Sequence, residues 1–228
     1  SIRIGESGGG STAELHIDSH ASVTETSGHV YLYGGGVLDF DGGTFNVNNN
    51  FYNYSNSTIK GHGTFTKDFG LAGVAFDGTN GQTLELNGRL SGTGALTKNG
   101  TGTLLLSGST SNTYSGAVNV NAGILKIEHE DALGESTNNN ANTTTTVASG
   151  ATLALNNSSA MTLYENLVIS GTGFEGAGAI DIVYGSHNIS GTVTLAGNST
   201  IDISSSDDTL TFSQVVSGSS NALTKTGA

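Results

Sequence analysis

The 228-residue sequence contains no cysteine and no proline. Without cysteine it forms no disulfide and offers no thiolate to a metal, so its stability must come from packing alone. Without proline no residue removes a backbone donor from a strand ladder, which fits a fold made of continuous ladders. Charged residues make up only 11% of the chain, and its formal net charge is -12. We therefore expect no nucleic-acid partner, because nucleic acid requires a basic face.

The sequence also lacks a long apolar run, an initiator methionine and a signal peptide at its first residue. A membrane-spanning helix needs about 18 or more consecutive apolar residues, so we expect no direct membrane insertion by this segment. Its last seven residues, ALTKTGA, match the sequence ALTKNGT at residues 95–101. We expect a segment of a longer protein, with any export signal and anchor outside it.

The chain is rich in glycine, and its apolar residues often alternate with polar ones. There are 35 glycines, and apolar residues stand two apart in pairs such as Leu104 and Leu106, Val118 and Val120, and Leu125 and Ile127. Residues two apart share one face of a strand. The Gly, Asn, Ser and Thr clusters between the pairs are typical of turns. The pattern predicts many short strands joined by turns.

Internal repeats decide between the two architectures that such strands allow, an antiparallel sandwich and a parallel solenoid. Residues 59–67, IKGHGTFTK, superpose without a gap on residues 90–98, LSGTGALTK, and residues 216–225, VSGSSNALTK, give a third copy. Repeats favour an all-β solenoid of about 20 residues and roughly three short strands per coil. The chain then has about eleven coils and a length on the order of 50 Å.

We expect residues 1–228 to form a single β-helical segment with one polar excursion. The excursion covers residues 128–146, EHEDALGESTNNNANTTTT, where the alternation stops. Residues 131–133 are expected to form one helical turn closed by Gly134.

The central sequence resembles a known family. The run GTGALTKNGTGTLLLSG, followed by NTYSGAVNVNAGIL and then DALG, is similar to the passenger-associated transport repeat of bacterial autotransporters. Residues 176–203 and 209–228 are also similar to autotransporter passenger sequence, whereas residues 1–58 share only composition and rhythm. The resemblance implies a right-handed parallel β-helix that type V secretion displays on the bacterial cell surface. Passengers of this family include adhesins, self-associating factors, toxins, proteases and esterases, so the resemblance alone does not settle the activity.

The strongest catalytic signal is the sequence GESGG at residues 5–9, which contains a G-x-S-x-G pattern around Ser7. That motif requires a preceding strand and a sharp turn into a helix, and nothing apolar supplies them here. A glycine-rich sequence also produces such a match by chance. We expect no enzyme activity and no cofactor.

Metal ligation is not expected from the sequence pattern. His16 and His20 would share a face only on a helix, and this region alternates as a strand. Asp39 and Asp41 lie beside two glycines, but the spaced ligands of a calcium loop are missing. The histidines are expected on the surface and the aspartates in an acidic turn.

Aromatic residues concentrate at Phe51, Tyr52, Asn53 and Tyr54. Aromatic faces and amide donors together suit sugar rings, so we predict ligand binding at these four residues. The alternative is that these aromatic residues cover the core.

The start of the polar excursion is the second predicted ligand-binding stretch, comprising Glu128, His129, Glu130 and Asp131. Recognition residues tend to lie on loops held by a rigid scaffold. The alternative is a solvated polar insert.

Three functions remain open. The first is adhesion or self-association, with an identical rod, a host-cell surface protein or a glycan as the partner. The second is a passive stalk that supports secretion and presents another domain. The third is a part of a secreted serine hydrolase.

Overall fold

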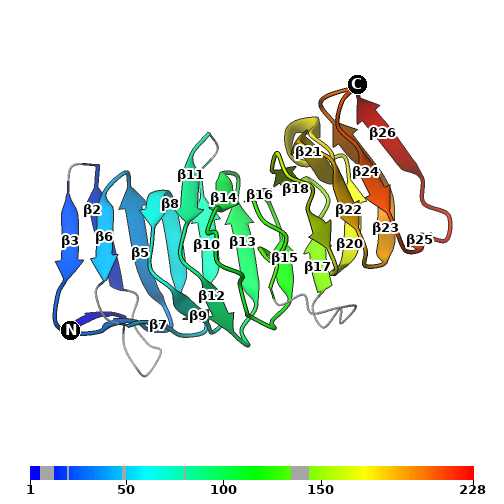
Figure 1. The fold of residues 1–228 in the computed structure, drawn as a ribbon. Helices are drawn as coiled ribbons and strands as arrows, with labels where there is room; N and C mark the ends of the chain where they lie inside the picture. The colour runs from blue at the N-terminus through cyan, green and yellow to red at the C-terminus, as the bar shows by residue number, and fades with distance from the viewer. Residues whose placement is uncertain (6–12, 20, 48–49, 80, 135–143) are drawn as a thin grey trace.

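The computed structural model describes residues 1–5, 13–19, 21–47, 50–79, 81–134 and 144–228. These residues form an elongated stack of short strands with the chain ends at opposite ends of the stack (Figure 1). The fold is an all-β parallel solenoid of about nine turns. Every strand pair of the described residues is parallel, as a solenoid requires (the pair β14 and β16 is an example). None of the described helices is long and apolar enough to cross a membrane.

One coil contains three strands, which occupy three successive faces. In the fifth coil β12 (Leu90–Gly92) lies on the first face, β13 (Leu96–Gly100) on the second and β14 (Thr103–Leu106) on the third. Glycines with positive φ form the corners, and Gly100 between the second and third faces has φ 65°. The side chain of any other residue would be strained in that conformation.

The first face is a five-stranded sheet in the order β1-β4-β7-β9-β12, and a three-stranded sheet β19-β22-β24 takes the same place in later coils. The remaining strands of this face are β1 (Ile2–Ile4), β4 (Val30–Leu32), β7 (Phe51–Asn53), β9 (Phe69–Leu71), β19 (Thr162–Leu163), β22 (His187–Ile189) and β24 (Leu210–Phe212).

A 16-stranded sheet supplies the second face and most of the third. Its second-face strands are β2 (Ala13–Asp18), β5 (Gly36–Asp41), β10 (Ala75–Gly78), β15 (Val118–Val120), β17 (Thr144–Val147), β20 (Asn166–Gly171) and β25 (Val216–Ser217). Its third-face strands are β11 (Thr83–Leu86), β16 (Gly123–Ile127), β18 (Ala151–Asn156), β21 (Ile180–Tyr184) and β26 (Leu223–Gly227). A separate pair, β3 (Ser22–Glu25) and β6 (Thr44–Val47), and one 3₁₀ turn, η1 (Phe174–Gly176), complete the described elements.

Two long strands join the second face to the third. They are β8 (Thr58–Phe65) and β23 (Val193–Ile203). The first half of β8 pairs with β5 and β10, and its second half pairs with β11. The bend in β8 lies at Gly61, which has φ 90° and no room for a Cβ, because that atom would stand 1.8 Å from the Phe40 carbonyl oxygen.

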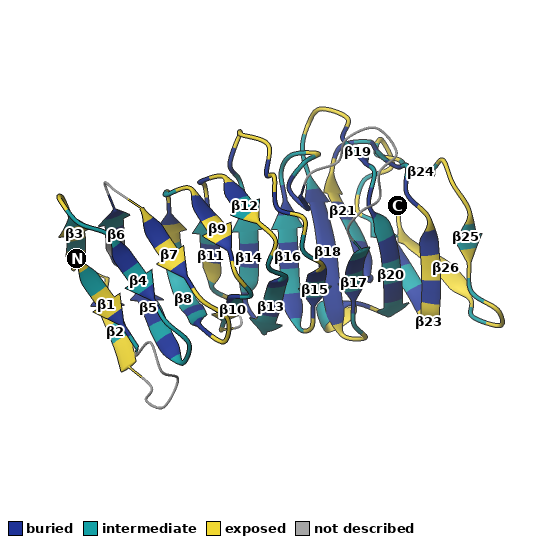
Figure 2. Ribbon diagram, turned by 90° about the horizontal axis from the view of Figure 1, so that it is seen from below, coloured by how far each residue is buried: buried dark blue, intermediate teal, exposed yellow. Residues whose placement is uncertain are grey.

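The core consists of inward side chains stacked from coil to coil. On the third face, Leu84, Leu104, Leu125, Leu153 and Ile180 form one parallel ladder, and each is at most 2% exposed. Figure 2 shows the same alternation of buried and exposed residues along the strands. Burying one such side chain contributes about 1.5–3 kcal/mol to the free energy of unfolding.

Aromatic packing replaces the aliphatic ladder in the N-terminal half of the core. Phe40, Phe45, Phe51, Phe65 and Phe69 are buried, and most of their contacts are edge-to-face with centroids 5.0–6.4 Å apart. Edge-to-face contacts of this kind stabilise the folded state beyond the contribution from burial of apolar surface. Phe51, predicted as a ligand-binding residue, is therefore a core residue.

The prediction of about eleven coils is wrong, because several coils are longer than the expected 20 residues. The step from Leu125 to its partner Leu153 and the step from Leu153 to Ile180 both include extra loop residues. In the first step, residues 128–134 form a turn in which the Gly134 amide donates to the Asp131 carbonyl over 3.3 Å. The structure has a hydrogen-bonded turn at residues 131–133, where a helical turn was expected. Residues 135–143 lie outside the described residues.

The sequence copies that contain lysine do not occupy equivalent positions. Lys98 pairs with Phe76 and Val120 on the second face, whereas Lys225 pairs with Ile201 on the third. Ile59, which the sequence superposition places on Leu90, instead pairs with Phe76. The repeats therefore predict the architecture correctly but assign these strands to the wrong faces.

Lys98 is a buried cation in the core ladder, with 1% of its surface exposed. Its ammonium donates to the carbonyl oxygens of Asn99, Gly100 and Ala122, over 2.5, 2.8 and 3.1 Å. Burial lowers the pKa of Lys98 to about 8. The lysine thereby closes the corner between the second and third faces in two successive coils.

We expect Leu104→Asp to lower the free energy of unfolding by at least about 3 kcal/mol. The substitution loses the burial of Leu104 and places a carboxylate inside the ladder. For a chain of this size we expect a fall in the melting temperature of roughly 6–12 °C. Leu105→Asp is the matched control, because Leu105 alternates with Leu104 and is only half-buried. Equal melting temperatures for the two variants would contradict the assigned inward face.

The buried carboxyl of Glu165 predicts a pH dependence of stability. Burial raises its pKa to about 7, above the ordinary value of 4.5. The folded state thus binds more protons than the unfolded state between pH 4.5 and 7, so stability is full below pH 4.5 and falls as the pH rises. We expect Glu165→Gln to melt higher than the unmodified chain at pH 8 and equally at pH 4. A constant difference between the two melting curves across this range would contradict the assignment.

Candidate functional site

Four tyrosines form the largest aromatic cluster on the outside of the solenoid. Tyr31 lies in β4 and Tyr52 in β7, while Tyr33 and Tyr54 directly follow those strands. Alternation along each strand points Val30, Leu32 and Phe51 into the core and the tyrosines outward. Because β4 and β7 pair in register, Tyr31 lies directly beside Tyr52.

The rings stack along the long axis of the solenoid. Tyr31 and Tyr52 have centroids 5.2 Å apart at an interplanar angle of 15°, and Tyr33 and Tyr54 have centroids 4.9 Å apart at 20°. The Arg3 guanidinium lies 5.8 Å from the centre of the Tyr31 ring, and His29 contacts Tyr52 edge-on at 5.6 Å. These contacts hold the tyrosines as one rigid platform.

The platform ends in a step at the next coil. The residue in register with Tyr52 on β9 is Gly70, which brings no side chain against the ring. A Cβ built on Gly70 would meet no atom closer than 3.8 Å, so the space beside Tyr52 is open. Ala72, two residues on, is small and exposed. Tyr52 and Tyr54, which are 38% and 43% exposed, therefore form a wall above a floor of small residues. We call Tyr52, Tyr54, Gly70 and Ala72 the tyrosine step.

Polar groups lie along the edge of the tyrosine step. The Asn50 amide nitrogen donates to the Tyr52 hydroxyl over 2.8 Å. On the following coils, the Arg89 backbone amide donates to the Asp68 carboxylate over 2.7 Å, and the two side chains approach to 3.9 Å. Asp68 and Arg89 are both exposed. A flat apolar wall with hydrogen-bonding groups beside it is the arrangement that suits a sugar ring.

The four residues predicted for ligand binding at 51–54 divide into two pairs. Tyr52 and Tyr54 face outward, as ligand binding requires. Phe51 is 3% exposed in the core, and Asn53 is 6% exposed, where its side chain donates to the Gly70 carbonyl and accepts from the Ala72 amide. Asn53 thus ties two coils together beneath the step. The prediction is corrected for Phe51 and Asn53, and it stays a prediction for the two tyrosines.

The other predicted residues, 128–131, lie in the turn that leaves the third face. Glu128 accepts from the Asn156 side chain over 2.9 Å, and Asp131 accepts from the Ser111 hydroxyl over 2.5 Å. His129 is half-buried, and desolvation lowers its pKa. Only Glu130 is exposed. The first and last of these side chains are thus engaged in packing the turn, and ligand binding here stays a prediction.

Tyr31 and Tyr33 are members of the platform that the sequence analysis missed. Both lie in HVYLYGGG, which shows the same two-residue spacing of tyrosines as FYNY. That shared spacing was the available signal, but only the register of β4 against β7 shows that the two pairs stack.

The candidate catalytic residue Ser7 and the candidate ligand His20 lie outside the described residues. His16 and Asp39 are described, and they lie beside each other on β2 and β5. Two groups on this surface have potential metal-ligand atoms within 4.8 Å of one another, namely Glu14, His16 and Asp39, and His16, Asp18 and Asp41.

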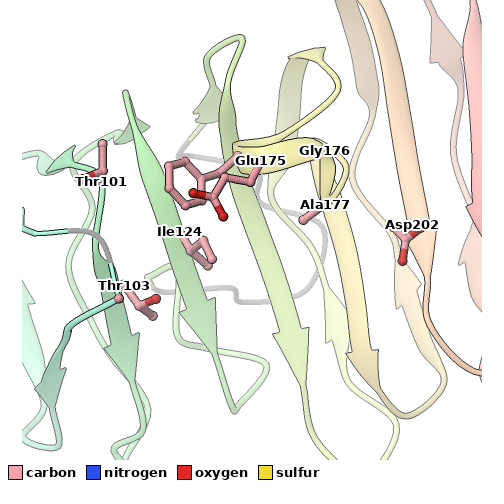
Figure 3. A pocket seen from close by; sticks show the side chains of 9 residues that line it. Thr101, Thr103, Ile124, Glu175, Gly176, Ala177 and Asp202 are labelled. Carbon is pink, nitrogen blue, oxygen red and sulfur yellow. The ribbon is translucent and has the colours of Figure 1, made fainter.

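A hollow of about 490 Å³ lies where η1 overhangs the third face. Figure 3 shows Thr101, Thr103 and Ile124 on one side of it, with Glu175 and Asp202 on the other. Asp202 also repels Asp181, whose pKa burial and this repulsion together raise to about 6. The hollow is broad, and its lining includes the Phe174 ring as well as the two carboxylates.

Comparison with known proteins agrees with this architecture. Residues 96–127, which cover β13 to β16, match the passenger-associated-transport-repeat family. The chain is 31% identical over 183 residues to the adhesin BmaC autotransporter of Brucella suis biovar 1 (strain 1330). That match covers 80% of this chain and 4% of the relative. No solved structure gives a significant match. The chain is therefore passenger-domain sequence of an autotransporter.

Proposed function

We propose that this chain is an adhesive, non-enzymatic part of a passenger displayed on the bacterial cell surface, and that the tyrosine step binds a saccharide. The observation that carries the proposal is the open side of Tyr52 and Tyr54 above Gly70 and Ala72. The relative, which is named an adhesin, supports the same class of function.

The shape and rigidity of the tyrosine step both suit a saccharide. A pyranose ring presents a flat face of C–H groups that packs on an aromatic ring, while its hydroxyls need donors and acceptors nearby. Asp68, Arg89 and the Tyr52 hydroxyl supply such groups. Stacking on Tyr31 and Tyr33 fixes the wall before a ligand arrives, so little conformational entropy is lost on binding.

The charge of the chain favours a glycan over a second copy of the same rod. The formal net charge is -12 with only seven lysines and arginines, so two parallel rods repel each other. A neutral glycan meets no such repulsion. One site gives weak binding, but many copies on one cell surface give high avidity.

We expect Tyr52→Ala and Tyr54→Ala each to weaken glycan binding by about two- to twelvefold, because each removes one ring face worth about 0.5–1.5 kcal/mol. Binding of the purified 228-residue chain to immobilised glycans and to cultured host cells measures this. Tyr184→Ala is the matched control, because Tyr184 is 56% exposed on β21, outside the step. The control should bind like the unmodified chain.

Three results would overturn the proposal. If Tyr184→Ala lost as much glycan binding as Tyr52→Ala and Tyr54→Ala, the tyrosine step would not be the binding surface. Binding only to beads coated with the same chain would show self-association instead. If no surface retains the chain more strongly than it retains an unrelated acidic protein, the result would support a passive stalk.

A further inference from the structure

Two histidines and two aspartates meet on the outer surface of β2, β5 and β8, where no function has been assigned. These strands pair in parallel, and their register aligns Asp18, Asp41 and His62 in one row across the three strands. His16 lies two residues before Asp18 and therefore on the same side of β2. Inward residues such as Ile17 and Phe40 alternate with these polar residues and are buried.

The polar atoms of His16, Asp18 and Asp41 converge, and His62 lies beside Asp41. The His16 Nε2 atom lies 3.0 Å from an Asp18 carboxylate oxygen, and His62 Nδ1 lies 3.6 Å from an Asp41 carboxylate oxygen. One ligand atom from each of His16, Asp18 and Asp41 can be chosen so that all three lie within 4.8 Å of one another. Ligands of a tetrahedral zinc ion stand about 3.3 Å apart, because each lies about 2.0–2.2 Å from the metal. A shift of about 1 Å in exposed side chains is enough to reach that geometry.

A second layer of charged residues holds His16 in place. The other ring nitrogen of His16, Nδ1, lies 2.8 Å from the Asp39 carboxylate. The Lys60 ammonium lies 3.4 Å from the same Asp39 carboxylate and 3.1 Å from the Glu14 carboxylate. A carboxylate bound to one imidazole nitrogen fixes the tautomer and directs the lone pair of the other nitrogen to a metal. Asp39 therefore orients His16 Nε2 toward Asp18 and Asp41.

We propose that His16, Asp18 and Asp41 bind one divalent transition-metal ion of the zinc class, and that His62, which lies beside Asp41, turns to supply the fourth ligand. Imidazole nitrogens and carboxylate oxygens are both ligands of zinc, whereas calcium and magnesium prefer oxygen ligands alone. The ion takes the place of the proton between His16 Nε2 and Asp18, which is released on binding. Asp39 is a positioning residue that does not touch the metal.

Backbone geometry at the neighbouring corner leaves room for the fourth ligand. Gly42 directly follows Asp41 and has φ 78°. A Cβ at Gly42 would stand 3.2 Å from His62 Nε2, so a larger residue there would crowd the imidazole. The amide of Gly42 also donates to the His62 carbonyl over 2.9 Å. The glycine thus keeps His62 next to Asp41 while leaving its ring free to turn.

The test is titration of the tag-free 228-residue chain with Zn²⁺. Calorimetry measures the binding, and the melting temperature measures the change in stability. We expect one Zn²⁺ per chain, a higher melting temperature, and no response to Ca²⁺ at the same concentration. His16→Gln and Asp41→Asn should each weaken Zn²⁺ binding by at least tenfold. Asp39→Asn should weaken it about 10–100-fold, as loss of a carboxylate behind a ligating histidine does elsewhere.

His29→Gln is the matched control, because His29 lies on the first face beside Tyr31 and Tyr52, away from this group. It should bind Zn²⁺ like the unmodified chain. Circular dichroism of each variant without metal checks that the strands are retained. Absence of Zn²⁺ binding by the unmodified chain, or equal binding by His16→Gln and His29→Gln, would overturn the proposal.

Discussion

Coil-to-coil register is the constraint on which the rest of this structure depends. Each inward side chain is buried only because the equivalent position of the next coil carries another one, as Leu104 and Leu125 do. A solenoid coil cannot bury its apolar face alone. With neither cysteine nor proline in the sequence, these ladders and their backbone hydrogen bonds supply the stability.

The same register determines what the outer surface can do. Since inward positions are fixed by packing, the alternating outward positions are free to carry other chemistry, and parallel pairing places them side by side. The tyrosine platform and the group around His16 both arise in this way, on adjacent faces of the N-terminal coils. Each is composed of residues about one coil apart in sequence. A rigid scaffold of this kind presents binding residues without the entropy cost of ordering a loop.

The two-residue alternation was sufficient to predict the strands, and the internal repeats were sufficient to predict the parallel solenoid. The prediction for residues 51–54 did not separate the outward Tyr52 and Tyr54 from the buried Phe51 and Asn53. Neither pattern was sufficient to predict how strands from different coils align. The similarity of residues 59–67 to residues 90–98 suggested equivalent positions, yet Ile59 aligns with Phe76 rather than with Leu90. Corner glycines and lysines recur at several corners, so a local match does not identify the face. The stacking of Tyr31 on Tyr52, and the proximity of His16 to Asp39, depend on that alignment and could not be read from the sequence.

The most direct test of this register is cross-linking of paired cysteines, which the cysteine-free chain makes possible. The structure places Thr97 opposite Asn119 on adjacent strands, whereas the sequence superposition places Thr66 in the position of Thr97. We expect the Thr97→Cys, Asn119→Cys double variant to form an intramolecular cross-link with a short bifunctional thiol reagent, detected by mass spectrometry. The Thr66→Cys, Thr97→Cys variant should remain uncross-linked. The reverse outcome would contradict the coil-to-coil register on which this account of the structure depends.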